Sequence, residues 1–357
     1  MKTYSHGNNS ESPGNTDYSD HVSIAKWYDD HLAAISITND HGNPLADTEK
    51  QVQSFMVENG MNLDYELITE EYLNNSEALE YLLQVLIPNG FGYYGHGHTH
   101  IDHDILSYHE KYESFRLCYE TIQQFGLKPV GYAYPYSKGN KAETRRALAD
   151  AGFLSGRMHS ISHHDNPYIM SDSILIPEDW YGLPTLVMQD YAFNQCDRCI
   201  NSTAELIPYL EEALQRKAWL ILTYHSIGNE RGWGFYKMSE FETDMLSIKE
   251  LDFWNASLNN VTLYSRQRET ATVEANRVID HSGRIRQLEI TLSHSLSNAM
   301  YDHPLTILLD VPVEWLSYSI TVSQNNHTVQ TVVFDTIKGK INLKPSQQKY
   351  LLTRNLD

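Results

Sequence analysis

The residues best suited to chemistry lie in one short histidine-rich stretch, residues 95–104, with the sequence GHGHTHIDHD. Four histidines and two aspartates follow directly on an apolar run that predicts a β-strand. Imidazole nitrogens and carboxylate oxygens are common ligands of zinc and of other divalent transition metals. The stretch therefore predicts a metal site at the end of a strand.

Two sets of metal ligands are compatible with the spacing in this stretch. His96 and His100 stand four residues apart, so they can bind one ion from a single turn of the chain. The stretch also matches the HxHxDH spacing of metallo-β-lactamase-like hydrolases, in which two metal ions would be bound by His98, His100, Asp102 and His103. The second set requires a β-sandwich over residues 30–230. The stretch alone leaves both sets open.

The elements around this stretch predict an α/β fold. Short apolar runs such as AAISIT (residues 33–38) and AWLILTY (residues 218–224) predict buried strands. Longer stretches between the runs, for example residues 48–59, have apolar residues three or four apart and predict helices. Alternating strands and helices form parallel βα units, so we expect a barrel or a doubly wound sheet.

The composition changes near residue 266. Beyond it, runs such as RQLEITLSH and SYSITVSQ alternate apolar and polar residues with no helical period, which predicts an antiparallel, sandwich-like β domain. We therefore expect a flexible arm at residues 1–26, a catalytic domain at residues 27–265 and an accessory β domain at residues 266–357. Bracing of the barrel is the expected role of the β domain.

Charge and hydropathy limit the partners. The formal net charge of −19 argues against binding to nucleic-acid phosphates or to an anionic membrane surface. No apolar run approaches the ~18 residues that a membrane-spanning helix needs. Residues 1–20 also lack the apolar core of a secretory leader.

The three cysteines are too few for a disulfide framework. Cys196 and Cys199 could form a redox pair or half of a zinc site, but a complete cysteine site needs more ligands than the chain offers. Two ordinary thiols or one local disulfide is the expectation.

Five motifs, taken in order along the chain, resemble those of the polysaccharide deacetylases of carbohydrate esterase family 4. A strand ending in Thr-Phe-Asp-Asp-Gly is matched by residues 38–42 (TNDHG), and the family's His-small-x-x-His motif by residues 96–100. The family's Pro-Tyr motif is matched by residues 134–136 (YPY), and its Asp-Trp pair by residues 179–180. A buried strand ending in His is matched at His225. The resemblance covers roughly residues 27–265 and implies a distorted (β/α) barrel.

The resemblance also implies a metal-dependent hydrolase that removes N- or O-acetyl groups from a poly- or oligosaccharide, acting outside the cytoplasm. Zinc, or another divalent transition metal, would activate water. The implied metal ligands are His41, His96 and His100. The implied catalytic groups are Asp40 as general base, the Tyr136 N–H at the oxyanion and His225 as general acid. The implied substrate-binding residues are Trp180, which would wall the acetyl pocket, and Tyr134.

The chain also departs from the family pattern. His41 stands where the family has a metal-binding Asp, and Ala133 stands where the third motif usually has an Arg. The group that tunes the base must therefore come from elsewhere in the chain. These departures keep a second hypothesis open, namely a non-catalytic carbohydrate-binding relative, and acetate release separates it from an active deacetylase.

Overall fold

The structure is a computed structural model, and it describes residues 15–40, 43–159, 166–190, 196, 199–345 and 349–355. The chain divides into two compact units. One is formed by His31–Arg266, and the other combines Met1–Asp30 with Gln267–Asp357. Among the described residues, every helix is too short or too polar to cross a lipid bilayer.

The first unit is built on parallel strands that curl into a nearly closed barrel. Its strands are β3 (Ala33–Asn39), β4 (Asp64–Leu67), β5 (Gly92–Gly95), β6 (Gly131–Ala133), β7 (Ser155–Met158), β8 (Leu183–Pro184), β9 (Leu186–Val187), β10 (Trp219–Tyr224) and β11 (Phe253–Asn255). Every residue of β3 and of β10 is buried, because helices cover the outer face of the barrel and side chains fill its interior.

One short segment closes the barrel. β8 pairs with β7 on one side, and β9, only one residue further along the chain, pairs with β10 on the other. Thr185 lies between them, and its hydroxyl contacts the Ile221 carbonyl at 3.0 Å and the Thr223 hydroxyl at 2.7 Å. Residues 183–187 thus join the two ends of the strand order.

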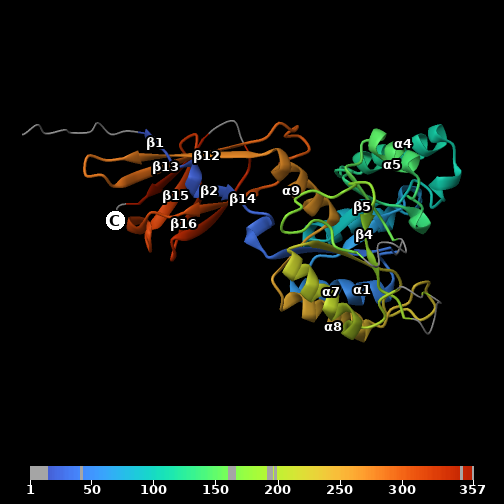
Figure 1. The fold of residues 1–357 in the computed structure, drawn as a ribbon. Helices are drawn as coiled ribbons and strands as arrows, with labels where there is room; N and C mark the ends of the chain where they lie inside the picture. The colour runs from blue at the N-terminus through green and yellow to red at the C-terminus, as the bar shows by residue number, and fades with distance from the viewer. Residues whose placement is uncertain are drawn as a thin grey trace, which may run out of the picture. The chain divides into compact units, whose positions relative to one another are not determined.

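The helices of the first unit lie around these strands, with α4 and α5 on one side of β4 and β5 and α1, α7 and α8 on the other (Figure 1). They are α1 (Asp47–Asn59), α2 (Thr69–Asn74), α3 (Ser76–Tyr81), α4 (Tyr108–Gln124), α5 (Ala142–Asp150), α7 (Thr203–Arg216), α8 (Met238–Lys249) and α9 (Leu258–Thr270). Their apolar faces pack on the strands to form the main core.

The second unit is antiparallel throughout its described pairings. One sheet has the order β1-β12-β13-β18-β15-β16, and the other has the order β17-β14-β2. The strands are β1 (Asn15–Asp17), β2 (Val22–Ile24), β12 (Thr272–Ile279), β13 (Ile285–Ser293), β14 (Leu305–Asp310), β15 (Ser319–Gln324), β16 (His327–Val333), β17 (Lys338–Leu343) and β18 (Tyr350–Arg354). The expected fold class, a (β/α) barrel with a C-terminal β domain, is confirmed.

The boundary between the units falls inside α9. Of the segment expected as an N-terminal arm, residues 1–14 lie outside the described part of the chain. Residues 15–26 contribute β1 and β2, which pair with β12 and β14. This part of the segment therefore belongs to the β unit.

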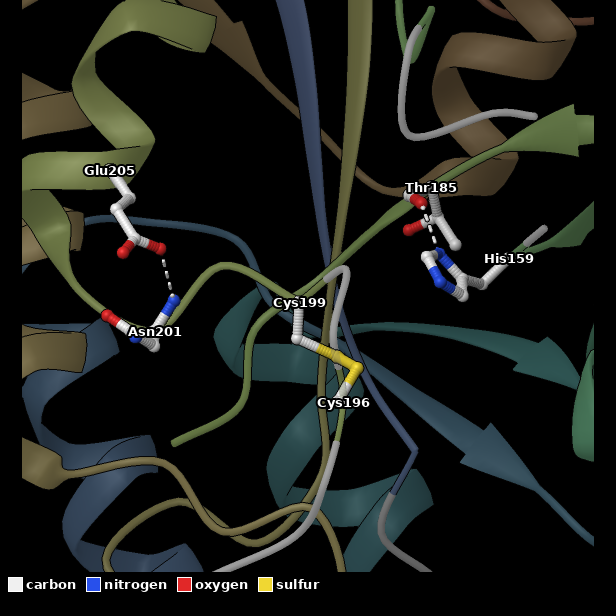
Figure 2. The surroundings of a disulfide bond; sticks show 6 residues. All are labelled: His159, Thr185, Cys196, Cys199, Asn201 and Glu205. Carbon is white, nitrogen blue, oxygen red and sulfur yellow. Dashed lines mark hydrogen bonds between the residues drawn. A yellow bond between two sulfur atoms is a disulfide. The ribbon is translucent and has the colours of Figure 1, made fainter. Parts of the chain in front are cut away.

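Cys196 and Cys199 form a local disulfide (Figure 2). Beside it, the N–H of Ile200 donates to the Val187 carbonyl at 2.8 Å, so this part of the chain is fixed to the end of β9. Both sulfurs are used in the bond, so the pair is not half of a zinc site. Cys118 is a buried thiol, and burial raises its pKa to about 12.

Candidate active site

Asp40 is fixed at the mouth of the barrel directly after β3. Its backbone N–H donates to the Tyr224 carbonyl at 2.9 Å, which continues the pairing of β3 with β10 by one residue. In parallel barrels the side chains that follow the carboxyl ends of the strands share one rim, and active sites are built there. Asp40 therefore stands where catalytic groups are expected.

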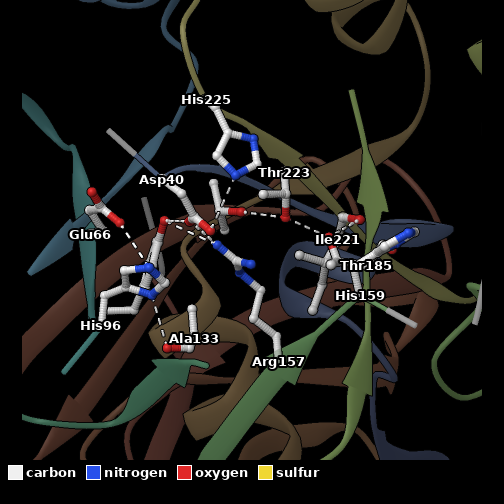
Figure 3. Close-up of polar contacts among 12 residues, drawn as sticks. Asp40, Glu66, His96, Ala133, Arg157, His159, Thr185, Ile221, Thr223 and His225 are labelled. Atoms are coloured by element: carbon white, nitrogen blue, oxygen red, sulfur yellow. Dashed lines mark hydrogen bonds and ion pairs between the residues drawn. The ribbon is translucent and has the colours of Figure 1, made fainter. Parts of the chain in front are cut away.

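Two side chains hold the same oxygen of Asp40. Arg157 on β7 donates to its Oδ1 (Figure 3). The Tyr94 hydroxyl on β5 donates to the same oxygen. Arg157 also donates to the Tyr94 oxygen at 3.1 Å, and its guanidinium lies 4.9 Å from the Tyr94 ring centroid. This arrangement leaves the second oxygen, Oδ2, directed toward His225, whose Nε2 lies 3.9 Å away.

The surroundings of Asp40 keep its carboxyl group ionised. Burial alone would raise the pKa of Asp40, but the positive charge of Arg157 and the hydrogen bond from Tyr94 outweigh burial and hold that pKa well below its ordinary value. Burial raises the pKa of the Tyr94 hydroxyl far above its usual value, so Tyr94 stays a donor. Arg157 thus supplies from β7 the charge that the missing arginine of the third motif does not supply.

His96 follows β5 and is oriented by a backbone carbonyl. Its Nδ1 lies 2.9 Å from the oxygen of Ala133, and a carbonyl can only accept, so Nδ1 carries the proton. The lone pair is then on Nε2, which lies 3.2 Å from the Oε2 atom of Glu66 on β4. Burial lowers the pKa of His96 to about 3, so the ring is neutral.

The pair formed by His96 and Glu66 fits a metal ion. Both side chains are buried, and two electron-pair donors 3.2 Å apart need a proton or a metal cation between them. Ligand atoms of Asp40, Glu66 and His96 all lie within 4.8 Å of one another. A histidine whose other nitrogen donates to a carbonyl is the usual form of a metal-binding imidazole. The residues present therefore suit a divalent metal.

His100 lies beside this group on the exposed rim. Its ring centroid is 5.0 Å from that of His96 and 4.4 Å from that of Tyr136. Tyr136 has a left-handed backbone (φ 55°, ψ 18°), which is uncommon for a residue with a side chain and is found mostly where the surrounding structure enforces it. Its side chain is 63% exposed.

His225 follows the fully buried strand β10. Its ring makes an edge contact with Trp233, with centroids 4.4 Å apart. The sequence locates Asp40, His96 and His225 at strand ends and His100 in the loop beyond His96, and the structure brings Asp40 together with His96 and His225. His41, the third expected metal ligand, lies outside the described residues.

The other polar residues of the histidine-rich stretch hold the loop in place. His103 is buried, stacks on Phe115 at 4.3 Å and contacts the Ser114 hydroxyl at 3.0 Å. Asp104 accepts hydrogen bonds from the N–H of Asn140 and the hydroxyl of Thr144. These contacts tie the stretch to α4 and α5.

The lactamase-like ligand set is not assembled. It requires a β-sandwich over residues 30–230, whereas His31–Arg266 form a parallel barrel. His98 contacts the Thr69 hydroxyl at 2.9 Å, and His103 points into the core. That alternative is therefore wrong.

Trp180 and Tyr134 lie apart from this group. The Trp180 ring packs against Arg266, whose guanidinium carbon is 4.5 Å from the ring centroid and which donates to the Leu154 carbonyl just before β7 begins. This is the amino end of β7, opposite the rim that carries Asp40. Tyr134 is buried, and its hydroxyl donates to the Tyr181 carbonyl at 3.0 Å. Asp179 of the same motif pairs with Arg145.

Sequence reasoning missed three buried side chains of the site: Glu66, Tyr94 and Arg157. Each lies within a strand rather than after it. The available signal was a charged residue inside a short strand, because a buried charge needs a partner. Glu66 and Arg157 carry that signal, and Tyr94 does not.

Comparisons with known proteins agree with this fold. A polysaccharide deacetylase of Mycobacterium smegmatis superposes with a TM-score of 0.53 at 15% identity, over 69% of this chain and 94% of that one. A polysaccharide deacetylase of Pseudomonas aeruginosa PAO1 gives 0.50 at 15% identity, over 67% and 93%. The PuuE allantoinase gives 0.50 at 11% identity, over 67% and 92%. The fold resemblance expected from the motifs is confirmed.

One sequence relative is a much longer protein than this chain. A gellan lyase of a Bacillus species is 22% identical over 313 residues, which are 84% of this chain but only 12% of that protein. No protein-family model matches the chain.

Proposed function

We propose that the protein is a metal-dependent carbohydrate deacetylase that hydrolyses N- or O-acetyl groups of a poly- or oligosaccharide. The observation that carries the proposal is the setting of Asp40. One of its oxygens is fixed by Arg157 and Tyr94, and the other faces His225 at 3.9 Å, next to the Glu66–His96 pair. Asp40 and His225 can transfer protons, and they lie beside residues that can bind a metal, which is the arrangement expected of a metal-dependent hydrolase.

The metal would be held by His96 and His100, with the Glu66 carboxylate beside His96 as a further ligand. His41 stays a predicted ligand from the motif resemblance. A bound zinc ion, or another divalent transition metal, would lower the pKa of water and so supply a nucleophile for an ester or an amide near neutral pH.

The chain's own groups would supply the proton transfers. Oδ2 of Asp40 takes the proton of the attacking water, because Oδ1 is already occupied by two donors. His225 faces the same oxygen and protonates the departing sugar nitrogen or oxygen. The backbone N–H of Tyr136, on the rim beside His100, is the proposed donor to the oxyanion.

A carbohydrate substrate is supported by two similarities. Two structural neighbours are described as polysaccharide deacetylases, and the sequence relative is named a gellan lyase. The net charge of −19 favours a neutral or cationic sugar chain over an anionic one.

The test is acetate release by the purified protein from chitin oligomers, acetylxylan and peptidoglycan, with bound metal measured by mass spectrometry. We expect about one divalent transition metal per chain and acetate release that a chelator abolishes and added zinc restores. Binding of these sugars without acetate release would support the non-catalytic alternative. If the protein neither bound these sugars nor released acetate from them, both the deacetylase proposal and the non-catalytic alternative would be overturned.

A further inference from the structure

Two large aromatic side chains are exposed next to the proposed catalytic residues. Trp233 is 66% exposed and contacts His225, and Tyr136 is 63% exposed and contacts His100. Rings of this size usually bury most of their surface. Exposed aromatic rings beside an active site are typical of surfaces that bind a ligand with an apolar face.

The fold holds Trp233 in place. The loop after His225 is closed by a bridge between Ile227 and Tyr236, and the Gly228 N–H donates to the Tyr236 carbonyl at 2.8 Å. Gly234 has a left-handed backbone (φ +67°), and a Cβ at this position would lie 2.9 Å from the Cβ of His225. Only glycine allows the loop to pass this close to His225, so the loop conformation fixes Trp233 beside it.

The strand order puts the two rings on opposite flanks of the site. Tyr136 follows β6 and Trp233 follows β10, and the strands between them are β5, β4 and β3. Glu66 lies on β4, and His96 and Asp40 are the first residues after β5 and β3. β6 and β10 are four strand spacings apart, about 19 Å along the curved barrel wall at ~4.8 Å for each spacing. The two aromatic rings therefore flank the proposed catalytic residues from different sides.

We infer that the site binds a neutral oligosaccharide in an extended form, with Trp233 and Tyr136 stacking on sugar units on either side of the acetylated unit. This inference rests on the proposed function. The C–H face of a pyranose is apolar and flat enough to cover an aromatic ring, whereas its hydroxyl groups stay in water. The length of the sugar chain then determines specificity, because Trp233 contacts the additional sugar unit on the side of His225.

The test measures binding separately from catalysis. In the Asp40→Asn background, calorimetry compares mono- and hexasaccharides of N-acetylglucosamine, acetylated xylose and acetylated cellulose. We expect at least one hexasaccharide to bind about tenfold more tightly than its monosaccharide. Adding Trp233→Ala should remove most of that difference, Trp233→Tyr should keep it, and Trp233→Leu, which restores bulk without an aromatic ring, should not.

The outcomes separate this inference from the proposed function. Acetate release with equal affinity for mono- and hexasaccharides, or hexasaccharide binding that Trp233→Ala leaves unchanged, would overturn the inference and leave the deacetylase standing. The parent protein could also bind the hexasaccharide through Trp233 and release no acetate. That result would support the inference and refute the proposed deacetylase activity. Absence of binding to every probe would overturn the inference.

Discussion

Four histidines within residues 96–103 divide into two pairs with different surroundings. His96 and His100 are neighbours at the rim, and His96 faces the carboxylates of the site. His98 and His103 bond to hydroxyl groups of neighbouring helices, and His103 is buried against Phe115. The residue type is the same, so the surroundings of each ring decide its role.

The local chain geometry explains this division. β5 ends at Gly95, so His96 is the first side chain beyond the strand, on the rim of the barrel. Gly97 then adopts a left-handed backbone (φ +99°) and turns the chain. Its carbonyl accepts from the Thr69 N–H at 3.0 Å, which fixes the loop to α2. At the other end, Ser107 begins α4 with a capping box. A density of histidines therefore predicts a site, but not which of them belong to it.

The largest expected effect comes from the site-facing pair. His96→Ala, and likewise His100→Ala, should lose the metal and reduce acetate release below detection, because the remaining donors bind a divalent metal too weakly. Metal content after dialysis and acetate release measure this. His98→Ala is the matched control in the same loop. Full metal content in His96→Ala would show that His96 does not bind the metal and that the two pairs of histidines do not differ in this role.

Asp40→Asn sharpens the division by separating metal binding from proton transfer. The amide can still accept from Arg157 and Tyr94, but its other atom cannot take a proton from water. We expect retained metal and a loss of kcat of about 10²- to 10⁴-fold. Steady-state acetate release and metal content measure it. Turnover at the parent rate would remove Asp40 as the base.

The strand ends of the site could be found from the sequence, but its interior could not. Asp40, His96 and His225 each follow an apolar run, and in a parallel barrel such positions converge on one rim. Arg157 and Glu66 lie within strands, where alternate side chains face the barrel interior or the helices. Which face is which depends on how the barrel closes, and closure depends on residues 183–187, far along the chain.

The Asp-Trp motif is the reverse case, in which the sequence predicted site residues that the structure places elsewhere. The dipeptide at residues 179–180 matches the family in order, but two letters specify no geometry. In the structure Asp179 pairs with Arg145, and Trp180 packs on Arg266. The exposed aromatic ring beside His225 is Trp233, in a glycine-rich loop that no motif marked.

The core-facing pair should affect stability rather than metal binding. His103→Asn removes the stacking on Phe115 and leaves a partly empty space in the core, so we expect a loss of about 2–4 kcal/mol in the free energy of unfolding. Metal content should stay at the parent level. Denaturant unfolding of the metal-free proteins measures the loss, and His109→Asn, on the exposed face of α4, is the control.

This stability difference should depend on pH. Burial lowers the pKa of His103 to about 4, whereas the unfolded chain has the ordinary histidine value of about 6.5. Between these values the unfolded state binds a proton that the folded state does not, so the contribution of His103 is complete above pH 6.5 and is lost as the pH falls toward 4. The gap in the free energy of unfolding between the parent and His103→Asn should shrink by up to about 3 kcal/mol over this range. A constant gap would place His103 in contact with water.

The smallest effect is expected at His98. Its ring is partly exposed and makes one described side-chain hydrogen bond, with the Thr69 hydroxyl at 2.9 Å, so His98→Ala should lower the free energy of unfolding by about 0.5–1.5 kcal/mol. The backbone bond from the Glu70 N–H to the carbonyl of residue 98 does not depend on the side chain, so the loop should keep its position. Metal content and kcat/KM should therefore stay within about twofold of the parent. A loss of metal in His98→Ala comparable to that in His96→Ala would show that the ring orients a ligand, and the two pairs of histidines would then form one site.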